Sequence, residues 1–396
     1  MTFIKMIQKP KILLITNRLV VGGPSRHIAM LAREMEKDYE VLVTGGGPGA
    51  GEVSAMDWFT GLQHQPLLLP QLNRKIKPLL DYGSYRYLRK IIRDFKPDIV
   101  HTHTSKVGVM GRLAARKEKV KKIVHTYHGL LFEHYFAPAF SAVLQSLERS
   151  LAGKTDRIIA LSESQKRDLS DKYRIAPREK ISVVPLALEQ SFFEVSDEMR
   201  REFRAQHYLK QEEVAIGIIG RLVKIKNIRF FIDALSELKK DKDLKFKAFV
   251  IGDGPEYGAL LAEAKQSLRV SEKLAVAADY DICFCSWAGQ LNFVYSGLDI
   301  VTLTSFAEGT PMSLMEAQAA GKAILAADVG GVGDVVQDTG ILYQAGNKEE
   351  YVRQLSGLIS SAQMREKLGV KAQTYAIKQY ASGRMINQLN EIYQKD

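Results

Sequence analysis

Cysteine is nearly absent from this chain of 396 residues, which holds only Cys283 and Cys285, in the sequence ICFCSW. Two cysteines that share one face of a strand cannot build a disulfide framework, and without neighbouring histidines they make a poor metal site. We interpret both as buried structural residues. Their scarcity favours a reducing, cytoplasmic compartment.

Long apolar runs are missing too. The longest fall far short of the roughly 20 residues that a transmembrane helix needs. The N-terminal segment MTFIKMIQKPKILLITN has lysines on both sides of a short apolar run and lacks a small-residue cleavage site, so it does not resemble a signal peptide. We therefore expect a cytoplasmic protein that is at most peripherally bound to a membrane.

Acidic residues are scarce in one half of the chain. The net charge is +11, but residues 1–190 carry 31 Lys and Arg against 18 Asp and Glu, and the remainder carries 25 against 27. A basic half favours an anionic partner: nucleic acid, a membrane surface or an anionic substrate.

Part of this charge lies in residues 73–96, NRKIKPLLDYGSYRYLRKIIRDFK, where basic residues alternate with Tyr, Leu and Ile at helical spacing. The segment is either a solvated helix face or a surface that rests on anionic lipid headgroups. We expect no nucleic-acid partner, because no recognition motif accompanies the patch.

Short apolar runs alternate with helical patterns, which is typical of βαβ units and of a parallel sheet covered on both faces. The series runs from KILLIT at residue 11 to ISVVPLAL near 188, and restarts with VAIGIIG at 214. We therefore predict an α/β protein with two doubly wound domains and a linker around 188–205. The expected site is the cleft between the domains, at the carboxyl ends of the strands.

The stretch EGTPMSLMEAQAAGKAILAADVGG begins with Glu308 and has a second glutamate at Glu316. Thr310 suits a helix N-cap and Pro311 the first helical position, so a helix N-terminus, an anion site, follows the strand DIVTLTS. Carboxylates beside an anion site suit hydroxyl groups as partners, and an anion flanked by hydroxyls describes a sugar nucleotide. Alternatively, Glu316 merely complements the helix dipole and Glu308 is a surface turn residue.

Two cations follow the strand VAIGIIG in the segment GRLVKIKN. Arg221 and Lys226 could neutralise a diphosphate leaving group. In the first half, Gly22 and Gly23 open a helix and would allow a ligand to approach the backbone closely. Their spacing does not match the dinucleotide fingerprint G-x-G-x-x-G.

Two further motifs carry metal-ligand residue types. Asp279 and Asp281 form a D-x-D pair, but it leads into a strand of an open α/β sheet, which is not the setting of a metal-binding D-x-D motif. His101 and His103 in HTHT are two positions apart, with no third ligand in evidence. We interpret them as lining of an acceptor site or as strand-end hydrogen-bonding groups, and predict no metal site.

Together these segments resemble the retaining glycosyltransferases of family four, which have the GT-B fold. The resemblance spans about residues 10–340 and rests on EGTPMSLME with the run that follows it, on VGGPSRHIAMLA, DIVHTHTSKVGVMGRLAA, HTYHG, TDRIIALSES, GRLVKIKN and VIGDGPE. Some pieces are similar to the branch that builds capsule, exopolysaccharide or lipid-linked glycans. One departure is VVPLALE at 183–189, where the family often has Asn-Gly after the proline, and it leaves contacts from that loop open.

The resemblance implies two Rossmann-like domains that face each other across a cleft. Residues 1–190 would form the acceptor-side domain and residues 191–375 the domain that binds the nucleotide-sugar donor. Residues 376–396 would form a last helix that crosses back to the first domain.

The resemblance also implies residue roles. Arg221 and Lys226 would hold the donor diphosphate, Glu308 would contact sugar hydroxyls, Glu316 would hold ribose hydroxyls, and His128 would lie near the sugar ring. The implied substrate-binding backbone is that of Gly22, Gly23, Thr310, Pro311, Met312, Ser313 and Leu314.

The implied function is transfer of a sugar from a nucleotide sugar, more often a UDP-sugar, to a glycan or lipid-linked acceptor with retention of configuration. No cofactor or metal is expected. The alternatives are a sugar-nucleotide hydrolase or epimerase of the same fold, and an inactive carbohydrate-binding homologue. The presence of Arg221, Lys226, Glu308 and Glu316 together favours an active enzyme.

Overall fold

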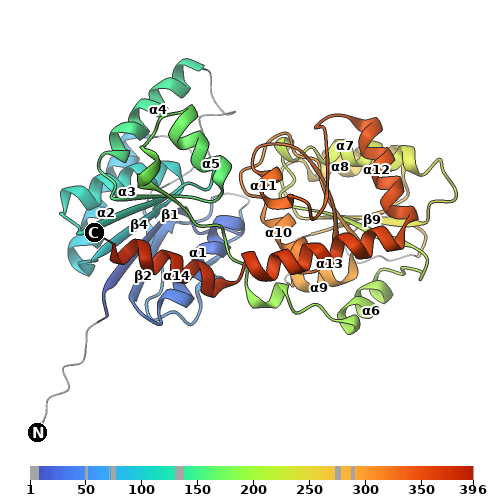
Figure 1. The fold of residues 1–396 in the computed structure, drawn as a ribbon, viewed down its shortest axis with the longest axis horizontal. Coiled ribbons are helices and arrows are strands. Elements are labelled where there is room, and N and C mark those ends of the chain that lie inside the picture. Colours follow the sequence, from blue (N-terminus) through green and yellow to red (C-terminus); the bar gives the residue numbers. More distant parts are fainter. Residues whose placement is uncertain are drawn as a thin grey trace, which may run out of the picture. The chain divides into compact units, whose positions relative to one another are not determined.

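The computed structural model describes residues 9–49, 52–70, 72, 77–129, 138–272, 278–286 and 290–395. The chain divides into an N-terminal unit, Met1–Ala187 with Ser382–Asp396, and a C-terminal unit, Leu188–Ala381 (Figure 1). Each unit contains one sheet of seven strands with helices packed against it. The predicted α/β class with two doubly wound parallel sheets is therefore confirmed.

The sheet of the N-terminal unit has the order β3-β2-β1-β4-β5-β6-β7, and its paired strands run parallel. Its strands are β1 (Lys11–Arg18), β2 (Glu40–Gly46), β3 (Leu67–Leu69), β4 (Ile99–His103), β5 (Lys122–Thr126), β6 (Arg157–Ala160) and β7 (Ile181–Val183). Its helices are α1 (Gly23–Met35), η1 (Met56–Phe59), α2 (Pro78–Phe95), α3 (Ser105–Lys117), α4 (Pro138–Ala152), α5 (Glu163–Arg167), η2 (Asp168–Lys172), η3 (Arg178–Lys180) and α14 (Ser382–Gln394).

Strand β1 shows why its sequence is apolar without alternation. Successive side chains of a strand point to opposite faces of the sheet. Ile12 and Leu14 pack in the cluster formed with α1 and α14, whereas Leu13 and Ile15 pack in the cluster formed with α2 and α3. Both faces of the strand are thus covered by helices.

The sheet of the C-terminal unit has the order β10-β11-β9-β8-β12-β13-β14, again with parallel pairs. Its strands are β8 (Val214–Ile219), β9 (Phe246–Ile251), β10 (Val270–Glu272), β11 (Ile282–Cys285), β12 (Ile300–Leu303), β13 (Ala323–Ala327) and β14 (Ile341–Tyr343). Its helices are η4 (Gln190–Phe192), α6 (Asp197–Gln206), η5 (Lys224–Lys226), α7 (Ile228–Leu238), α8 (Tyr257–Ser267), α9 (Leu291–Gly297), α10 (Met312–Ala319), α11 (Val332–Val336), α12 (Lys348–Ser360) and α13 (Ala362–Gln379).

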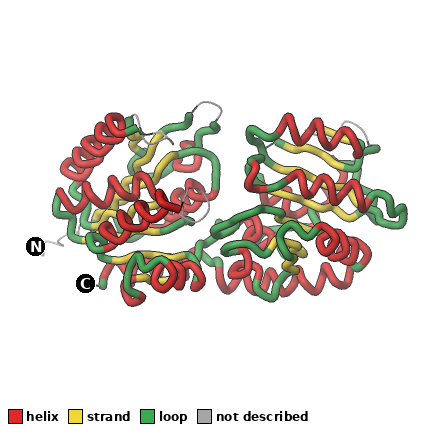
Figure 2. Tube along the Cα trace, turned by 90° about the horizontal axis from the view of Figure 1, so that it is seen from above, coloured by secondary structure: helices red, strands yellow, loops and turns green. Residues whose placement is uncertain are grey.

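The order of strands reverses at one place in each sheet. In the N-terminal unit this place is between β1 and β4, and in the C-terminal unit it is between β8 and β12. Loops that leave the carboxyl ends of two such strands run to opposite faces of the sheet, so ligands bind there in this class of fold. Figure 2 shows the strands of each unit lying between helices.

The predicted linker at 188–205 is partly wrong, because it contains most of α6. Phe203 of α6 is buried, and its ring contacts Phe249 of β9 at a centroid distance of 5.3 Å. Arg200 and Arg204 of the same helix both pair with Asp299. The sequence DEMRREFRAQ is mostly charged, so its one buried aromatic side chain gives no apolar periodicity.

The structure places the boundary between the units after Ala187, whereas the sequence analysis places it after residue 190. Position 376 lies inside α13, and the last helix, α14, begins at Ser382 and belongs to the N-terminal unit. There it contributes Leu389 and Tyr393 to the cluster that includes α1.

No helix within the described ranges is long and apolar enough to cross a membrane.

Candidate functional site

The loops that follow β8 and β12 are joined by an ion pair. Lys226 Nζ donates to Glu308 Oε1 over 2.5 Å, and Ser305 Oγ donates to the same oxygen over 2.6 Å. A charge-assisted bond between partly buried groups orients both side chains. The predicted cation and the predicted carboxylate therefore lie together at the point where the strand order reverses.

Backbone contacts hold the same two loops in place. The Thr304 hydroxyl lies 3.1 Å from the carbonyl oxygen of Lys226 and 3.0 Å from that of Asn227. The Phe306 N–H donates to the Ile225 carbonyl over 2.8 Å. Asn227 has a left-handed backbone, φ 50°, which asparagine tolerates better than most residues. The position of Lys226 is thus set by the loop that also carries Glu308.

Two glycines on the next connection support the Glu308 loop. The Gly331 N–H donates to the Glu308 carbonyl over 3.1 Å. A Cβ on Gly330 would lie 2.1 Å from the Glu308 carbonyl oxygen, and a Cβ on Gly331 would lie 2.0 Å from that of Gly309. No other residue type fits such a close approach. The sequence analysis assigned these two glycines no role.

Helix α10 begins one residue later than predicted. Its N-cap is Pro311, with an extended backbone at ψ 100°, and its first helical residue is Met312, so Thr310 is not the cap. No side chain among the described residues caps α10. Proline has no backbone N–H, so this residue leaves no donor unpaired at the N-cap position. The Leu314 N–H donates to the Pro311 carbonyl over 3.1 Å. The side chain of Leu314 is buried in the core.

Glu316 lies inside α10 and is only 4% exposed. The Tyr295 hydroxyl lies 2.8 Å from Glu316 Oε2 and 3.0 Å from the Ser313 carbonyl oxygen. A carboxylate that served only to complement the helix dipole would need no burial and no dedicated donor. Burial with an oriented partner favours a positioned acceptor of hydrogen bonds.

Arg221 follows β8 after a single residue, Gly220, and is exposed. Within the described part of the chain, no side chain pairs with the Arg221 guanidinium group, whereas the Lys226 ammonium group pairs with Glu308. The loop after β8 thus carries an arginine that is available to bind an anionic ligand.

The N-terminal unit brings a second group of predicted residues to the carboxyl edge of its sheet. Gly22 is the N-cap of α1, and a Cβ at this position would meet nothing within 4 Å. At the ends of the neighbouring strands, His103 Nδ1 lies 3.0 Å from His128 Nε2. Burial lowers the pKa of His128 to about 4, so its ring is neutral near pH 7.

His27 of α1 joins this pair, which the sequence analysis missed. One ring nitrogen from each of His27, His103 and His128 lies within 4.8 Å of the others. A third histidine therefore lies beside His103, which the spacing of HTHT does not reveal. No sequence spacing could have found the group, because its members come from three separate elements.

His101 plays the structural role that the sequence analysis allowed. Its Nδ1 lies 2.6 Å from the Tyr393 hydroxyl of α14, and its Nε2 lies 2.7 Å from the Thr126 hydroxyl. Both ring nitrogens are thus occupied, and the ring links α14 to the sheet.

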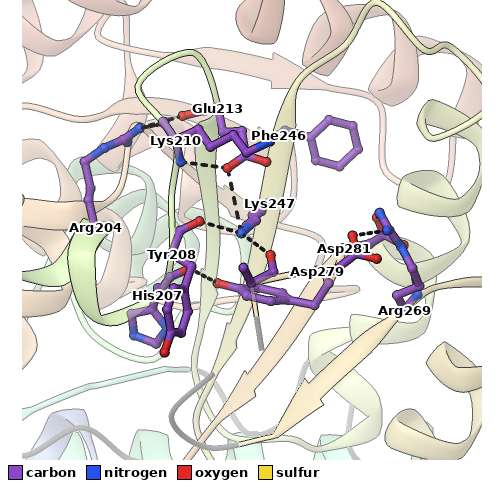
Figure 3. A network of polar contacts seen from close by, with 12 residues as sticks. Arg204, His207, Tyr208, Lys210, Glu213, Phe246, Lys247, Arg269, Asp279 and Asp281 are labelled. Atoms are coloured by element: carbon purple, nitrogen blue, oxygen red, sulfur yellow. Dashed lines mark hydrogen bonds and ion pairs between the residues drawn. The ribbon is translucent and has the colours of Figure 1, made fainter. Parts of the chain in front are cut away.

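The D-x-D pair is part of an ion-pair network (Figure 3). Asp281 accepts hydrogen bonds from the backbone N–H of Arg269 at 2.9 Å and from its guanidinium group at 2.7 and 3.1 Å, and it pairs with Lys239 at 3.1 Å. Burial alone would raise the pKa of Asp281, but these donors lower it to about 2. Asp279 pairs with the same arginine. Both carboxylates are thus engaged by cationic side chains.

Sequence comparison matches residues 21–191 to the family Glycosyltransferase Family 4 and residues 199–375 to the family Glycosyl transferases group 1. The chain is 27% identical over 293 residues to an Escherichia coli UDP-Gal:alpha-D-GlcNAc-diphosphoundecaprenol alpha-1,3-galactosyltransferase, which covers 72% of this chain and 73% of that protein. It is 26% identical over 314 residues to the Bacillus subtilis putative glycosyltransferase EpsD, covering 78% of this chain and 79% of the relative.

Solved structures show the same fold. A glycosyltransferase from Rickettsia africae superimposes with a TM-score of 0.78 at 18% identity, over 98% of both chains. Anabaena Alr3699/HepE in complex with UDP superimposes with a TM-score of 0.76 at 18% identity, over 96% of this chain and 99% of that one. These similarities confirm the predicted GT-B fold.

We predict that Asp281→Asn destabilises the protein in a pH-dependent way. The native pKa of Asp281, about 2 against a usual 3.8, corresponds to about 2 kcal/mol. This contribution is fully present above pH 3.8 and is lost as the pH falls through 2. Urea unfolding should therefore show a gap of about 2 kcal/mol between wild type and variant at pH 6 that closes between pH 4 and pH 2.

Asp279→Asn is the control, because Asp279 pairs with the same arginine but is 78% exposed in its side chain. It should change stability by less than about 0.5 kcal/mol. A gap for Asp281→Asn that is independent of pH would contradict the assignment.

Proposed function

This chain belongs to glycosyltransferase family 4, and on that premise we propose that it transfers a sugar from a UDP-sugar to a glycan or lipid-linked acceptor, with retention of configuration. The observation that carries the proposal is the Lys226–Glu308 ion pair beside the N-terminus of α10, at the point where the strand order of the second sheet reverses.

The donor diphosphate would be bound by cations and by the helix N-terminus. Arg221 is exposed and uncommitted among the described residues, and Lys226 is oriented by Glu308. Helix α10 has no side-chain cap, so its first N–H groups carry the positive end of the helix dipole. These charges also stabilise the diphosphate as it leaves. We therefore expect transfer to need no metal ion.

The donor hydroxyl groups would be bound by the two glutamates. Glu308 accepts from Lys226 and Ser305, and its position before donor binding is already set, which reduces the entropy lost on binding. Glu316 is buried beside Tyr295 and suits a ribose hydroxyl. A carboxylate held by a lysine is poorly placed to attack a sugar carbon. We infer that the acceptor hydroxyl attacks the sugar carbon itself, that the bond from this carbon to the diphosphate breaks, and that the leaving diphosphate takes the acceptor proton.

His128 would contact a substrate sugar as a neutral imidazole. Its pKa of about 4 makes it a hydrogen-bonding group rather than a cation near pH 7. This role agrees with its place after β5, at the carboxyl edge of the sheet.

The comparisons support UDP as the nucleotide and a lipid-linked acceptor. The Escherichia coli relative is named for UDP-Gal and for an acceptor on diphosphoundecaprenol, and the Anabaena structure contains UDP. We propose the same donor class and an acceptor of this kind for this chain, with a role in cell-surface glycan synthesis.

An acceptor on a lipid would bring the protein to the cytoplasmic face of a membrane. Helix α2 of the basic N-terminal unit exposes Leu79 by 88% and Tyr82 by 62%, and Arg86 follows one turn later on the same face and is also exposed. Exposed apolar side chains next to a cation are typical of a surface that rests on anionic lipid. We propose that this face of α2 contacts the membrane.

We predict that Lys226→Met weakens UDP binding by about 10-fold to 100-fold, the usual value of a hydrogen bond to a charged group. Calorimetric titration with UDP measures the change. Lys224→Met is the matched control, since Lys224 lies in the same short helix, η5, and is exposed. Equal affinities for the two variants would refute the role of Lys226, and binding of GDP in preference to UDP would refute the proposed base.

Release of UDP should depend on an acceptor. With UDP-galactose, UDP-glucose or UDP-N-acetylglucosamine as donor, we expect at least one to give rapid UDP release when an extracted polyprenyl-diphosphate-sugar fraction is present. Without that fraction, we expect release at least about 100-fold slower, because water would have to replace a positioned acceptor. Equal rates in both reactions would show a hydrolase instead.

Arg86→Glu should weaken sedimentation with vesicles of phosphatidylglycerol and phosphatidylcholine by at least about 5-fold, because each basic residue near such a surface contributes about 1 kcal/mol. Lys242→Glu makes the same charge change at an exposed site in the C-terminal unit and should have no effect. The membrane proposal fails if the native protein does not bind these vesicles at low salt.

A further inference from the structure

Three histidines of the N-terminal unit form a cluster at the carboxyl edge of its sheet. His27 comes from α1, His103 ends β4, and His128 follows β5. Their ring centroids are 5.3 to 6.0 Å apart. One nitrogen from each ring lies within 4.8 Å of the others. Three imidazole nitrogens this close together form a set that could hold one metal ion.

Hydrogen bonding accounts for only part of this cluster, since His103 Nδ1 and His128 Nε2 lie within hydrogen-bonding distance of each other. His27 Nδ1 and His103 Nε2 are buried and have no hydrogen-bond partner among the described residues. Leaving a buried polar atom unpaired costs about 1–3 kcal/mol. In contrast, the adjacent His101 uses both of its nitrogens in hydrogen bonds. Of the two histidines of β4, only the one in the cluster thus keeps an unpaired nitrogen, although His125 Nε2 on the neighbouring β5 is also unpaired among the described residues.

The charge state of the rings suits a cation. Burial and the neighbouring histidines keep the pKa of His27 and of His103 well below the usual value, so all three rings are neutral near pH 7. A neutral imidazole offers a lone pair to a metal. The distance of 3.0 Å from His103 Nδ1 to His128 Nε2 is close to the separation of about 3.3 Å between two nitrogen ligands of a tetrahedral zinc ion, so a metal ion would replace the proton that these two nitrogens share. The three nitrogens of the set lie within 4.8 Å of one another, a longer limit than that separation, so binding would draw the rings closer together.

We propose that His27, His103 and His128 bind one Zn²⁺ ion, with one imidazole nitrogen each. Three neutral nitrogen ligands select zinc or a similar transition metal over Mg²⁺ or Ca²⁺, which prefer oxygen. Two of the rings are buried and His128 is partly exposed, so the fourth ligand position opens on the His128 side, where a water molecule or a substrate oxygen can bind.

Zinc bound at this site would inhibit sugar transfer and would take no part in the reaction. This consequence rests on the proposed function, in which His128 contacts a substrate sugar. Because the metal would hold the His128 nitrogen, bound zinc should lower the rate of UDP release.

The test is calorimetric titration of the tag-free, EDTA-treated full chain with ZnCl₂, without donor or acceptor. We expect one zinc ion per chain and binding at least about 100-fold weaker in His27→Gln, since loss of even a supporting group of a metal site costs 10-fold to 100-fold. His64→Gln is the matched control, because His64 lies in the same unit but pairs with Glu40. It should bind zinc as the wild type does.

The thiols of the C-terminal unit are the competing site, since Cys283 Sγ lies 3.6 Å from Cys285 Sγ. Cys283→Ser should therefore leave zinc affinity unchanged. The absorption spectrum of the Co²⁺-loaded wild type should show nitrogen ligands and no thiolate charge-transfer band, a result that does not require any variant to fold. Loss of binding in Cys283→Ser, a thiolate spectrum, or an unchanged affinity in a folded His27→Gln would each overturn the proposal.

In a UDP-release assay, zinc should inhibit the wild type and should inhibit His27→Gln much less. Because the titration needs no turnover, zinc binding can succeed or fail independently of the transferase assignment.

Discussion

The ion pair between Lys226 and Glu308 is the interaction on which the C-terminal unit builds its site. It joins the connections after β8 and β12, the two strands between which the sheet reverses its order. Each partner balances a partly buried charge that would be costly if left alone. Ser305 shares the carboxylate oxygen, and the close approach at Gly330 and Gly331 fixes the backbone beneath it. The arrangement leaves the cation and the carboxylate oriented before any ligand binds.

In the N-terminal unit too, the carboxyl ends of the parallel strands meet at one edge of the sheet, but the side chains that lie there are chemically different. This edge gathers neutral histidines beside the Gly22 turn, and within the described part of the chain no carboxylate belongs to the cluster of His27, His103 and His128. The positive charge of this unit lies elsewhere, in part on the exposed face of α2 that carries Arg86. One fold, used twice in this chain, thus presents charged groups for an anion in one unit and uncharged ring nitrogens in the other.

The sequence analysis succeeded where a residue's role depends on near neighbours. Central strands such as β1, β4, β8 and β12 are buried on both faces, so their apolar runs were predicted from sequence. The edge strands β3, β7, β10 and β14 have three residues each, too few to show a period, and only β7 lies in an apolar run that the sequence analysis named, ISVVPLAL. The charged helix α6 was taken for a linker because its stability comes from Phe203 and from the ion pairs with Asp299. The start of α10 was misplaced by one residue, since Thr310 and Pro311 both suit a helix N-terminus.

The sequence by itself determined the alternation of strands and helices, the restart that makes two units, and the identity of Arg221, Lys226, Glu308 and Glu316 as candidate ligands of a sugar nucleotide. Only the tertiary structure decided that Lys226 pairs with Glu308, that Asp281 is satisfied by Arg269 and Lys239, and that His27 joins His103 and His128. The physical reason is that hydrophobic periodicity is a local property of the chain. Pairing between side chains depends instead on strand order, which brings residues together regardless of how far apart they lie along the sequence.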